Sequence, residues 1–232
     1  MLGALNTYKG EKLFPADQMK IWDISRTLSN DLAPWPGDTP FNFELTARLG
    51  DKAVVNVGAI RMSVHNGSHA DAPFHFEKDG VTIEQVTLET YIGRAVVVDL
   101  CRYFKGAEGE LITIDQLRAG AGDLMETSRV LLKTGVWPDT TVFPKHIPVI
   151  AADVADWLKR NGVRLIGLDL PSVDRINAKV LQNHYSLAGC GISIIESLDL
   201  SGVEAGSYNF AALPLKIAGG DAAPLRAVLW RD

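Results

Sequence analysis

The hydrophobic positions of this chain follow two patterns that predict β-strands. Residues 42–49 and 56–65 alternate apolar and polar side chains, as strands with one buried face do, and the second is expected to end at His65. Unbroken apolar runs bounded by turn residues, typical of strands buried on both faces, occur at 94–100, 129–136 and 164–171. Further strands are predicted at 21–28, 192–198, 207–217 and 225–231.

Helical periodicity is confined to a few segments, and helices are predicted at 113–120, 151–162 and 177–189. The second of them carries Val154, Ala155 and Leu158 on one face, with Gly162 placed to end it. Because strands outnumber helices, we expect a beta-rich mixed α/β fold, in which a central sheet is covered by few helices. The length of 232 residues favours a single domain over 20–232, preceded by a leader segment over 1–19.

Charge and composition exclude several classes of partner. The formal net charge is −5 and basic residues do not cluster, so neither nucleic acid nor an anionic membrane is an expected partner. No apolar run approaches the roughly 18 residues that cross a bilayer, and the first residues lack the pattern of a secretory signal. Cys101 and Cys190 are read as free thiols, which favours a cytoplasmic location.

Three of the five histidines fall in one short window together with an aspartate. His65, His69, Asp71 and His75 form the pattern H-x3-H-x-D-x3-H. Gly67 and Pro73 argue against a helix in this window. A strand that ends at His65, followed by a tight turn at 66–67, would instead bring His69 back toward the same point.

Imidazole and carboxylate groups at this spacing predict a metal site. First-row divalent metals bind both groups, and a catalytic site keeps one position open. His65, His69 and Asp71 would supply three ligands, and Asp71 could bridge to a second metal because it has two oxygens. His75 could be either a ligand or a base. The alternative is a chance cluster on a solvated loop, but the apolar neighbours in this segment argue against that reading.

The segment HNGSHADAPFHF, residues 65–76, resembles the H-x-G-T-H-x-D-x-P-x-H-F signature of the cyclase-like metal-dependent hydrolases. That family includes bacterial kynurenine formamidases (arylformamidases) and isatin hydrolases. WPGDTPF (35–41), LIGLDLPSVD (165–174) and ALPLKIAGGDAAPLRAVL (212–229) resemble other formamidase segments. The similarity runs from about Ile21 to the end of the chain.

The resemblance implies a swivelling β/β/α fold, a homodimer or higher homo-oligomer, and one or two bound metals per subunit, with two zinc ions expected and manganese as the other candidate. It makes His65, His69 and Asp71 ligands of one metal. Asp71 would bridge to a second metal, which His184 and Glu196 also hold. His75 takes the position of the proton shuttle, and Trp35 lines the substrate pocket.

The residues themselves support these distant positions unequally. His184 lies on a predicted helix, where a lone histidine is more often an ordinary surface or core residue. Glu196 lies in the apolar run ISIIESL, where an unpaired acid is costly, so a metal partner explains it better than chance. Trp35 precedes Pro-Gly and could pack at a turn instead of contacting an aryl substrate.

The implied activity is hydrolysis of N-formyl-L-kynurenine to L-kynurenine and formate, a step of tryptophan catabolism. Three departures stand out: Ser68 replaces Thr and keeps the hydroxyl, Asn66 replaces Thr, and Tyr185 stands where many formamidases carry a second histidine. Tyr185 and Asn66 leave open a different substrate, such as the cyclic amide isatin. A non-catalytic metal- or ligand-binding homologue is a further alternative. A serine hydrolase is disfavoured because the chain has no G-x-S-x-G motif.

Overall fold

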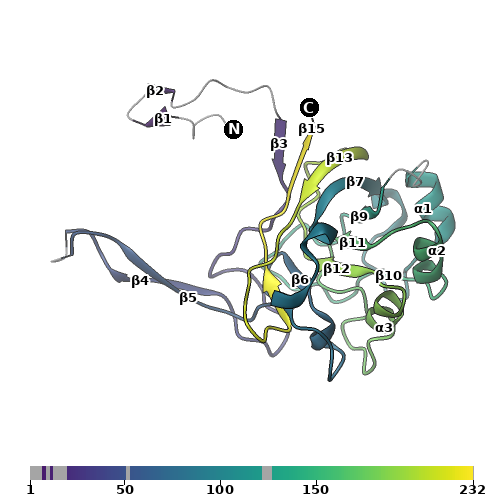
Figure 1. The fold of residues 1–232 in the computed structure, drawn as a ribbon, viewed down its shortest axis with the longest axis horizontal. Helices are drawn as coiled ribbons and strands as arrows, with labels where there is room; N and C mark the ends of the chain where they lie inside the picture. Colours follow the sequence, from purple (N-terminus) through teal and green to yellow (C-terminus); the bar gives the residue numbers. More distant parts are fainter. Residues whose placement is uncertain (1–6, 9–10, 13–19, 51–52, 122–126, 232) are drawn as a thin grey trace.

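The computed structural model describes residues 7–8, 11–12, 20–50, 53–121 and 127–231. Most of the segment 1–19, which the sequence sets apart as a leader, lies outside the described residues. Within them, no helix combines the length and apolar character that crossing a membrane requires. A single mixed sheet of nine strands, in the order β14-β6-β12-β11-β9-β7-β13-β15-β3, dominates the fold (Figure 1).

The centre of this sheet is parallel and its two sides are antiparallel. The parallel strands are β7 (Ile92–Asp99), β9 (Arg129–Lys133), β11 (Leu165–Leu168) and β12 (Ser193–Glu196). Antiparallel strands extend one side with β6 (His69–Asp71) and β14 (Ala222–Pro224), and the other with β13 (Gly206–Ala211), β15 (Val228–Arg231) and β3 (Lys20–Asp23).

The unbroken apolar runs lie in the centre of the sheet and are buried on both faces, as predicted. In β7, Val96 and Val98 belong to the core cluster on one face, while Ala95 and Val97 belong to the cluster on the other. A β-carbon on Gly167 in β11 would approach the side chains of its neighbours to 2.6 Å, so packing between strands leaves room only for hydrogen there. These strands form the rigid platform on which the site is built.

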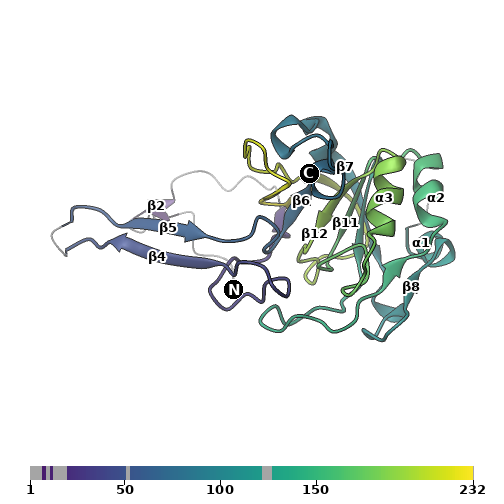
Figure 2. The ribbon, with the colours of Figure 1, turned by 90° about the horizontal axis from the view of Figure 1, so that it is seen from below.

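Three α-helices occur in the described residues: α1 (Ile114–Ala121), α2 (Val154–Arg160) and α3 (Gln182–Gly189). Figure 2 shows them together on one side of the sheet. The predicted helix 177–189 begins five residues late, because the Asp174 carboxylate accepts hydrogen bonds from the backbone amides of Asn183 and His184 and so caps the first turn there.

Shorter elements complete the described chain. The 3₁₀ helices are η1 (Pro73–His75), η2 (Ile83–Gln85), η3 (Leu88–Tyr91) and η4 (Cys101–Tyr103). The short strand pairs are β1 (Thr7–Tyr8) with β2 (Glu11–Lys12), and β8 (Leu111–Ile112) with β10 (Val149–Ile150).

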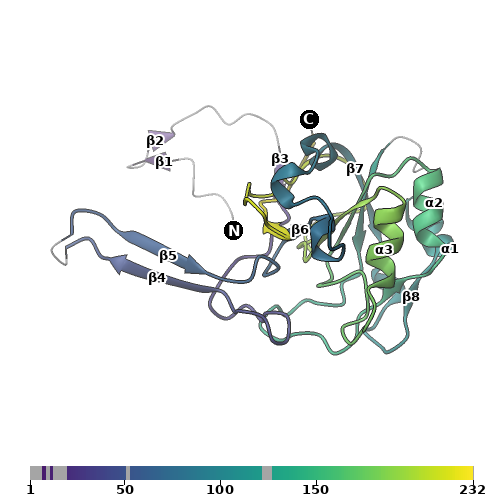
Figure 3. The same cartoon turned by 60° about the horizontal axis from the view of Figure 1, so that its bottom comes forward.

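The two alternating segments form a separate hairpin, β4 (Asn42–Ala47) with β5 (Val57–Arg61), which projects away from the body (Figures 1 and 3). The expected strand end at His65 is therefore wrong: β5 ends at Arg61, and a hydrogen bond from Asn66 N to Ser63 O closes a turn around His65. The expected burial of one face is also absent, since the paired side chains Phe43 and Ile60 are 45% and 62% exposed. The alternation is real, but this chain's own core does not cover the apolar face.

Candidate metal centre

The HNGSH segment turns sharply into the sheet. Gly67 has a left-handed φ of 68°, a conformation that favours glycine, and a β-carbon there would lie 2.7 Å from Leu28 Cδ2 and displace the end of that side chain. The turn leads into β6, whose three residues, from His69 to Asp71, are buried between β12 and β14. His65 lies on the turn before β6, and His75 lies on η1 after it.

Strand pairing and one helix bring the distant residues to this segment. In the antiparallel pair of β6 and β12, Glu196 lies directly opposite His69. His184 is a buried residue of α3, whose first turn is capped by Asp174. Both residues therefore reach the place that the resemblance implies, through contacts that local sequence does not specify.

Four side chains converge around Asp71, which lies between the histidines. Asp71 Oδ1 is 3.4 Å from His65 Nδ1 and 3.4 Å from His69 Nε2, while its Oδ2 is 3.5 Å from His184 Nε2. Glu196 closes the group, with one oxygen 3.5 Å from His69 Nε2 and the other 3.5 Å from His184 Nε2. The donor atoms thus form two triads that share Asp71: His65, His69 and Asp71, and Asp71, His184 and Glu196.

The spacing of the donor atoms suits ligands of a shared divalent cation better than it suits direct hydrogen bonds between them. Among the described residues, both oxygens of Asp71 and Nε2 of His69 are buried without a hydrogen-bond partner. Their separations exceed a normal hydrogen bond, whereas ligands of a tetrahedral site with bonds of about 2.0–2.1 Å lie roughly 3.4 Å apart. Buried polar atoms with no partner usually indicate a missing ion or water, so these residues fit a metal.

The electrostatics of the cluster also favour a cation. Burial by itself lowers the pKa of His69 and His184, but the neighbouring carboxylates overcome this and raise the pKa of each to about 10. Burial raises the pKa of Asp71, yet the surrounding histidines hold it well below its usual range. The carboxylates of this site therefore attract positive charge, whether from protonated imidazole or from a bound cation.

Each of the three clustered histidines has its second ring nitrogen engaged. His69 Nδ1 is 2.9 Å from Gly67 O, and His184 Nδ1 is 2.8 Å from Asp174 Oδ2. His65 Nε2 is 3.0 Å from Asp221 Oδ2. In every case the nitrogen that faces Asp71 is left available, as in metal sites where an outer group fixes the ligand tautomer. Sequence reasoning missed Asp174 and Asp221, although both lie in segments that resemble the family.

Ser68 supports the strand ends behind the cluster. Its hydroxyl donates to Ser197 O at 2.7 Å and accepts from Arg26 N at 2.9 Å. Ser197, directly after Glu196, has a positive φ of 60°, an uncommon backbone conformation that these bonds help to hold. The hydroxyl is the group in use, which explains why serine can replace the usual threonine.

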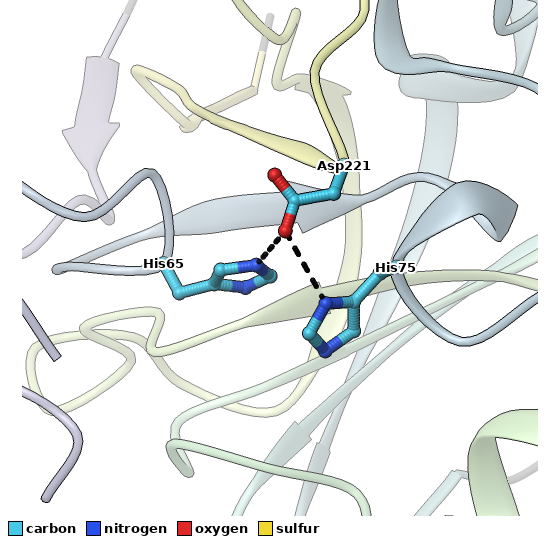
Figure 4. A group of neighbouring side chains, drawn as sticks. All are labelled: His65, His75 and Asp221. Atoms are coloured by element: carbon cyan, nitrogen blue, oxygen red, sulfur yellow. Dashed lines mark hydrogen bonds and ion pairs between the residues drawn. The ribbon is translucent and has the colours of Figure 1, made fainter. Parts of the chain in front are cut away.

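His75 lies beside the cluster and outside both triads. Its ring centroid is 4.2 Å from that of His65, and its Nδ1 is 3.5 Å from Asp221 Oδ2 (Figure 4). Burial lowers the pKa of His75 from its usual value, whereas nearby carboxylates raise the pKa of His65, His69 and His184. A histidine that stays neutral at the edge of a metal site is suited to accept a proton.

The cluster opens into a cavity of about 420 Å³. Trp35 lines it and packs edge-on against Phe143, with ring centroids 5.3 Å apart, and the ring centroid of Trp137 lies 5.7 Å from that of Phe143. Trp35 thus both packs and faces the cavity, while Trp137 and Phe143 were not predicted. Asn66 also lines the cavity, whereas Tyr185 is 48% exposed and lies outside its lining. Tyr185 instead packs against Phe76, with ring centroids 5.9 Å apart.

Comparison with known proteins agrees with the fold and the motif. The family model described as Cyclase matches residues 22–175. The kynurenine formamidase of Geobacillus thermodenitrificans is 44% identical over 91% of this chain and 98% of its own length. The kynurenine formamidase of Bacillus cytotoxicus is 38% identical over 89% of this chain and 95% of its own length.

Solved structures extend the comparison. A "predicted metal-dependent hydrolase" from Bacillus stearothermophilus is 28% identical, with a TM-score of 0.75 over 92% of this chain and 99% of that one. Isatin hydrolase A from Labrenzia aggregata is 24% identical, with a TM-score of 0.79 over 91% of this chain and 93% of that one, and shows the fold alone. The expected mixed sheet with few helices is confirmed. From its motif, its fold and its relatives, the chain belongs to the cyclase family.

Proposed function

We propose that this protein is a metal-dependent amide hydrolase that converts N-formyl-L-kynurenine and water to L-kynurenine and formate. The observation that carries the proposal is the buried cluster around Asp71. The oxygens of Asp71 have no hydrogen-bond partner in the described residues, and the cluster opens into a cavity lined by aromatic side chains. Relatives named kynurenine formamidase at 38–44% identity support this substrate.

We propose His65, His69 and Asp71 as ligands of one metal, and Asp71, His184 and Glu196 as ligands of a second. The donor set suits zinc, with manganese as the other candidate. When bound, such a cation supplies Lewis acidity, which lowers the pKa of nearby water toward 7 and polarises a carbonyl group. The Val173 amide donates to Glu196 Oε1 at 2.9 Å and holds that carboxylate in place.

His75 is the proposed proton shuttle. It accepts a proton from the water that attacks the formyl carbon. It then donates that proton to the aryl amine nitrogen as the C–N bond breaks, so that formate and the free amine leave. The depressed pKa of a partly buried imidazole keeps it neutral and able to accept the proton at pH 7.

The cavity walls suit an aryl amino acid. Trp35, Phe143 and Trp137 offer edge and face contacts to an aromatic ring. Asp38 also lines the cavity and lies outside the metal cluster, where Ser63 Oγ donates to its carboxylate at 2.9 Å. We assign Asp38 to the α-ammonium group of the substrate, because opposite charges attract strongly in a partly desolvated pocket. Isatin has no such group, and the isatin hydrolase structures match at 24% identity or less.

The exposed hairpin supports a homodimer. Phe43 and Ile60 lie opposite each other on one face of the β4–β5 ribbon, and both are exposed. A lone two-stranded hairpin is marginally stable in water, so an apolar face of this kind is expected to be covered. We propose that a second copy of the chain covers it. The free thiols Cys101 and Cys190 support a cytoplasmic location.

Elemental analysis of the purified protein, combined with an N-formyl-L-kynurenine assay, tests the function. We expect zinc or manganese in stoichiometric amounts, turnover that a chelator abolishes, and no loss with a serine-directed reagent. Isatin serves as the comparison substrate and is expected to react more slowly. Metal-loaded protein that leaves N-formyl-L-kynurenine intact would refute the proposal.

A further inference from the structure

Asp221 lies at the edge of the site, on a segment held firmly against β6. It directly precedes β14, and Ala222 pairs with Asp71 across the two strands. The amide of Ala72 donates to the Asp221 carbonyl at 2.9 Å. Gly220 is closely surrounded, since a β-carbon there would lie 2.9 Å from the side chain of Ile83. The backbone of Asp221 is therefore fixed relative to Asp71.

A single carboxylate oxygen of Asp221 faces two histidines. Oδ2 is 3.0 Å from His65 Nε2 and 3.5 Å from His75 Nδ1 (Figure 4). The two rings are tilted by 42° and lie side by side. The Asp221 side chain is 42% exposed, so it reaches this position from the surface and does not fill a core site.

The first of these contacts selects the tautomer of His65. A neutral imidazole carries its proton on one nitrogen only, and the Asp221 carboxylate accepts that proton at Nε2. With that proton held at Nε2, the other nitrogen, Nδ1, which lies 3.4 Å from Asp71 Oδ1, is the one available to a metal. Asp174 does the same for His184 through the opposite ring nitrogen.

The second contact orients His75. With Nδ1 directed at Asp221, the Nε2 edge of the ring is left for the cavity, which His75 lines. The negative charge of Asp221, 3.5 Å from Nδ1, favours a proton on that nitrogen, which leaves Nε2 with the free lone pair that a proton acceptor needs.

His65, His75 and Asp221 could also be read as a third metal triad, because their donor atoms lie close together. The 3.0 Å separation of Asp221 from His65 is that of a hydrogen bond, however, and His65 has only one other nitrogen, which faces Asp71. A carboxylate that accepts a hydrogen bond from His65 and also faces His75 explains the geometry without requiring His65 to bind two metals.

We infer that Asp221 is a positioning residue that serves the metal ligand His65 and the proton shuttle His75 at the same time. The inference rests on the proposed function, in which His65 binds metal and His75 moves the proton. Its consequence is that metal affinity and the proton transfer depend on one carboxylate.

The test compares Asp221→Asn with Asp174→Asn, which removes the carboxylate that contacts a different proposed metal ligand, His184. Asp115→Asn, an exposed position on α1, controls for the loss of charge. Both of the first two variants are expected to bind zinc about 10–100-fold more weakly than wild type. At saturating zinc, the control Asp115→Asn should match the turnover of wild type. Asp221→Asn should stay at least roughly tenfold low in kcat with KM little changed, because His75 has lost its partner.

Imidazole resonances of the zinc-loaded, ¹⁵N-histidine-labelled protein give a second readout that does not depend on activity. The Nε2–H of His65 should be observable in wild type and lost to solvent exchange in Asp221→Asn. Unchanged zinc affinity and an unchanged resonance in the variant would overturn the role toward His65. Full recovery of kcat at saturating zinc would overturn the role toward His75. Wild-type protein with neither metal nor turnover would instead refute the proposed function itself.

Discussion

The substitution Asp71→Asn should make the melting temperature of this protein independent of added metal. Asp71 belongs to both donor triads, and each of its oxygens faces a different set of histidines. Asparagine keeps the size of the side chain but removes the negative charge and one acceptor oxygen. Both proposed sites should therefore lose affinity together, although other ligands remain in each.

The size of the effect follows from binding linkage. A metal present at 100 times its Kd stabilises the folded state by about 2.7 kcal/mol, and a domain of this length gains about 2–4 °C per kcal/mol, so wild type should melt roughly 5–11 °C higher with metal than with chelator. In Asp71→Asn the same comparison should give a shift close to zero. The metal-free variant should melt lower than metal-free wild type, because the surrounding histidines lose the carboxylate whose pKa they depress, so each protein is compared with its own metal-free form.

Thermal unfolding followed by fluorescence, with and without zinc, measures this difference directly. Asp115→Asn, which changes the same charge at an exposed position, should keep the wild-type shift. A zinc-dependent shift in Asp71→Asn equal to that of wild type would show that the cluster around Asp71 is not where the metal binds.

Three further predictions concern the chemistry, the pocket and the assembly. His75→Ala should keep its metal by elemental analysis while kcat falls about 10²–10⁴-fold, and loss of metal in parallel would make His75 a ligand. Asp38→Asn should raise KM for N-formyl-L-kynurenine but leave KM for formanilide, which lacks the ammonium group, unchanged; an equal rise for both would refute the assignment. Replacing both Phe43 and Ile60 by Glu should convert a dimer to a monomer in light scattering, and a dimer that persists would place the interface elsewhere.

Local sequence was sufficient for much of the framework and for the centre of the site. The apolar runs at 94–100, 129–136 and 164–171 form buried strands, because a strand covered on both faces needs apolar side chains at every position. His69 and Asp71 could be recognised because metal-binding side chains in an apolar segment need a partner. Glu196 carried the same signal within its apolar run.

Local sequence failed where the partner of a residue lies far away along the chain. The alternating segments at 42–49 and 56–65 were expected to bury one face, but the strands they form are largely exposed. Alternation predicts that a strand has an apolar face, but it does not predict which part of the molecule covers that face. The late start of α3 depends on Asp174. Its carboxylate, which lies outside the helix, accepts hydrogen bonds from first-turn N–H groups that have no carbonyl partner within the helix.

By itself, the sequence determined which strands are buried and which side chains can bind a metal, because burial and donor chemistry belong to individual residues. Only the tertiary structure decided that β6 lies between β12 and β14, which sets Glu196 opposite His69 and Asp221 beside His65. It alone also decided that Phe143 joins Trp35 in the cavity wall. Strand order and register arise from packing over the whole chain, so no single segment contains that information.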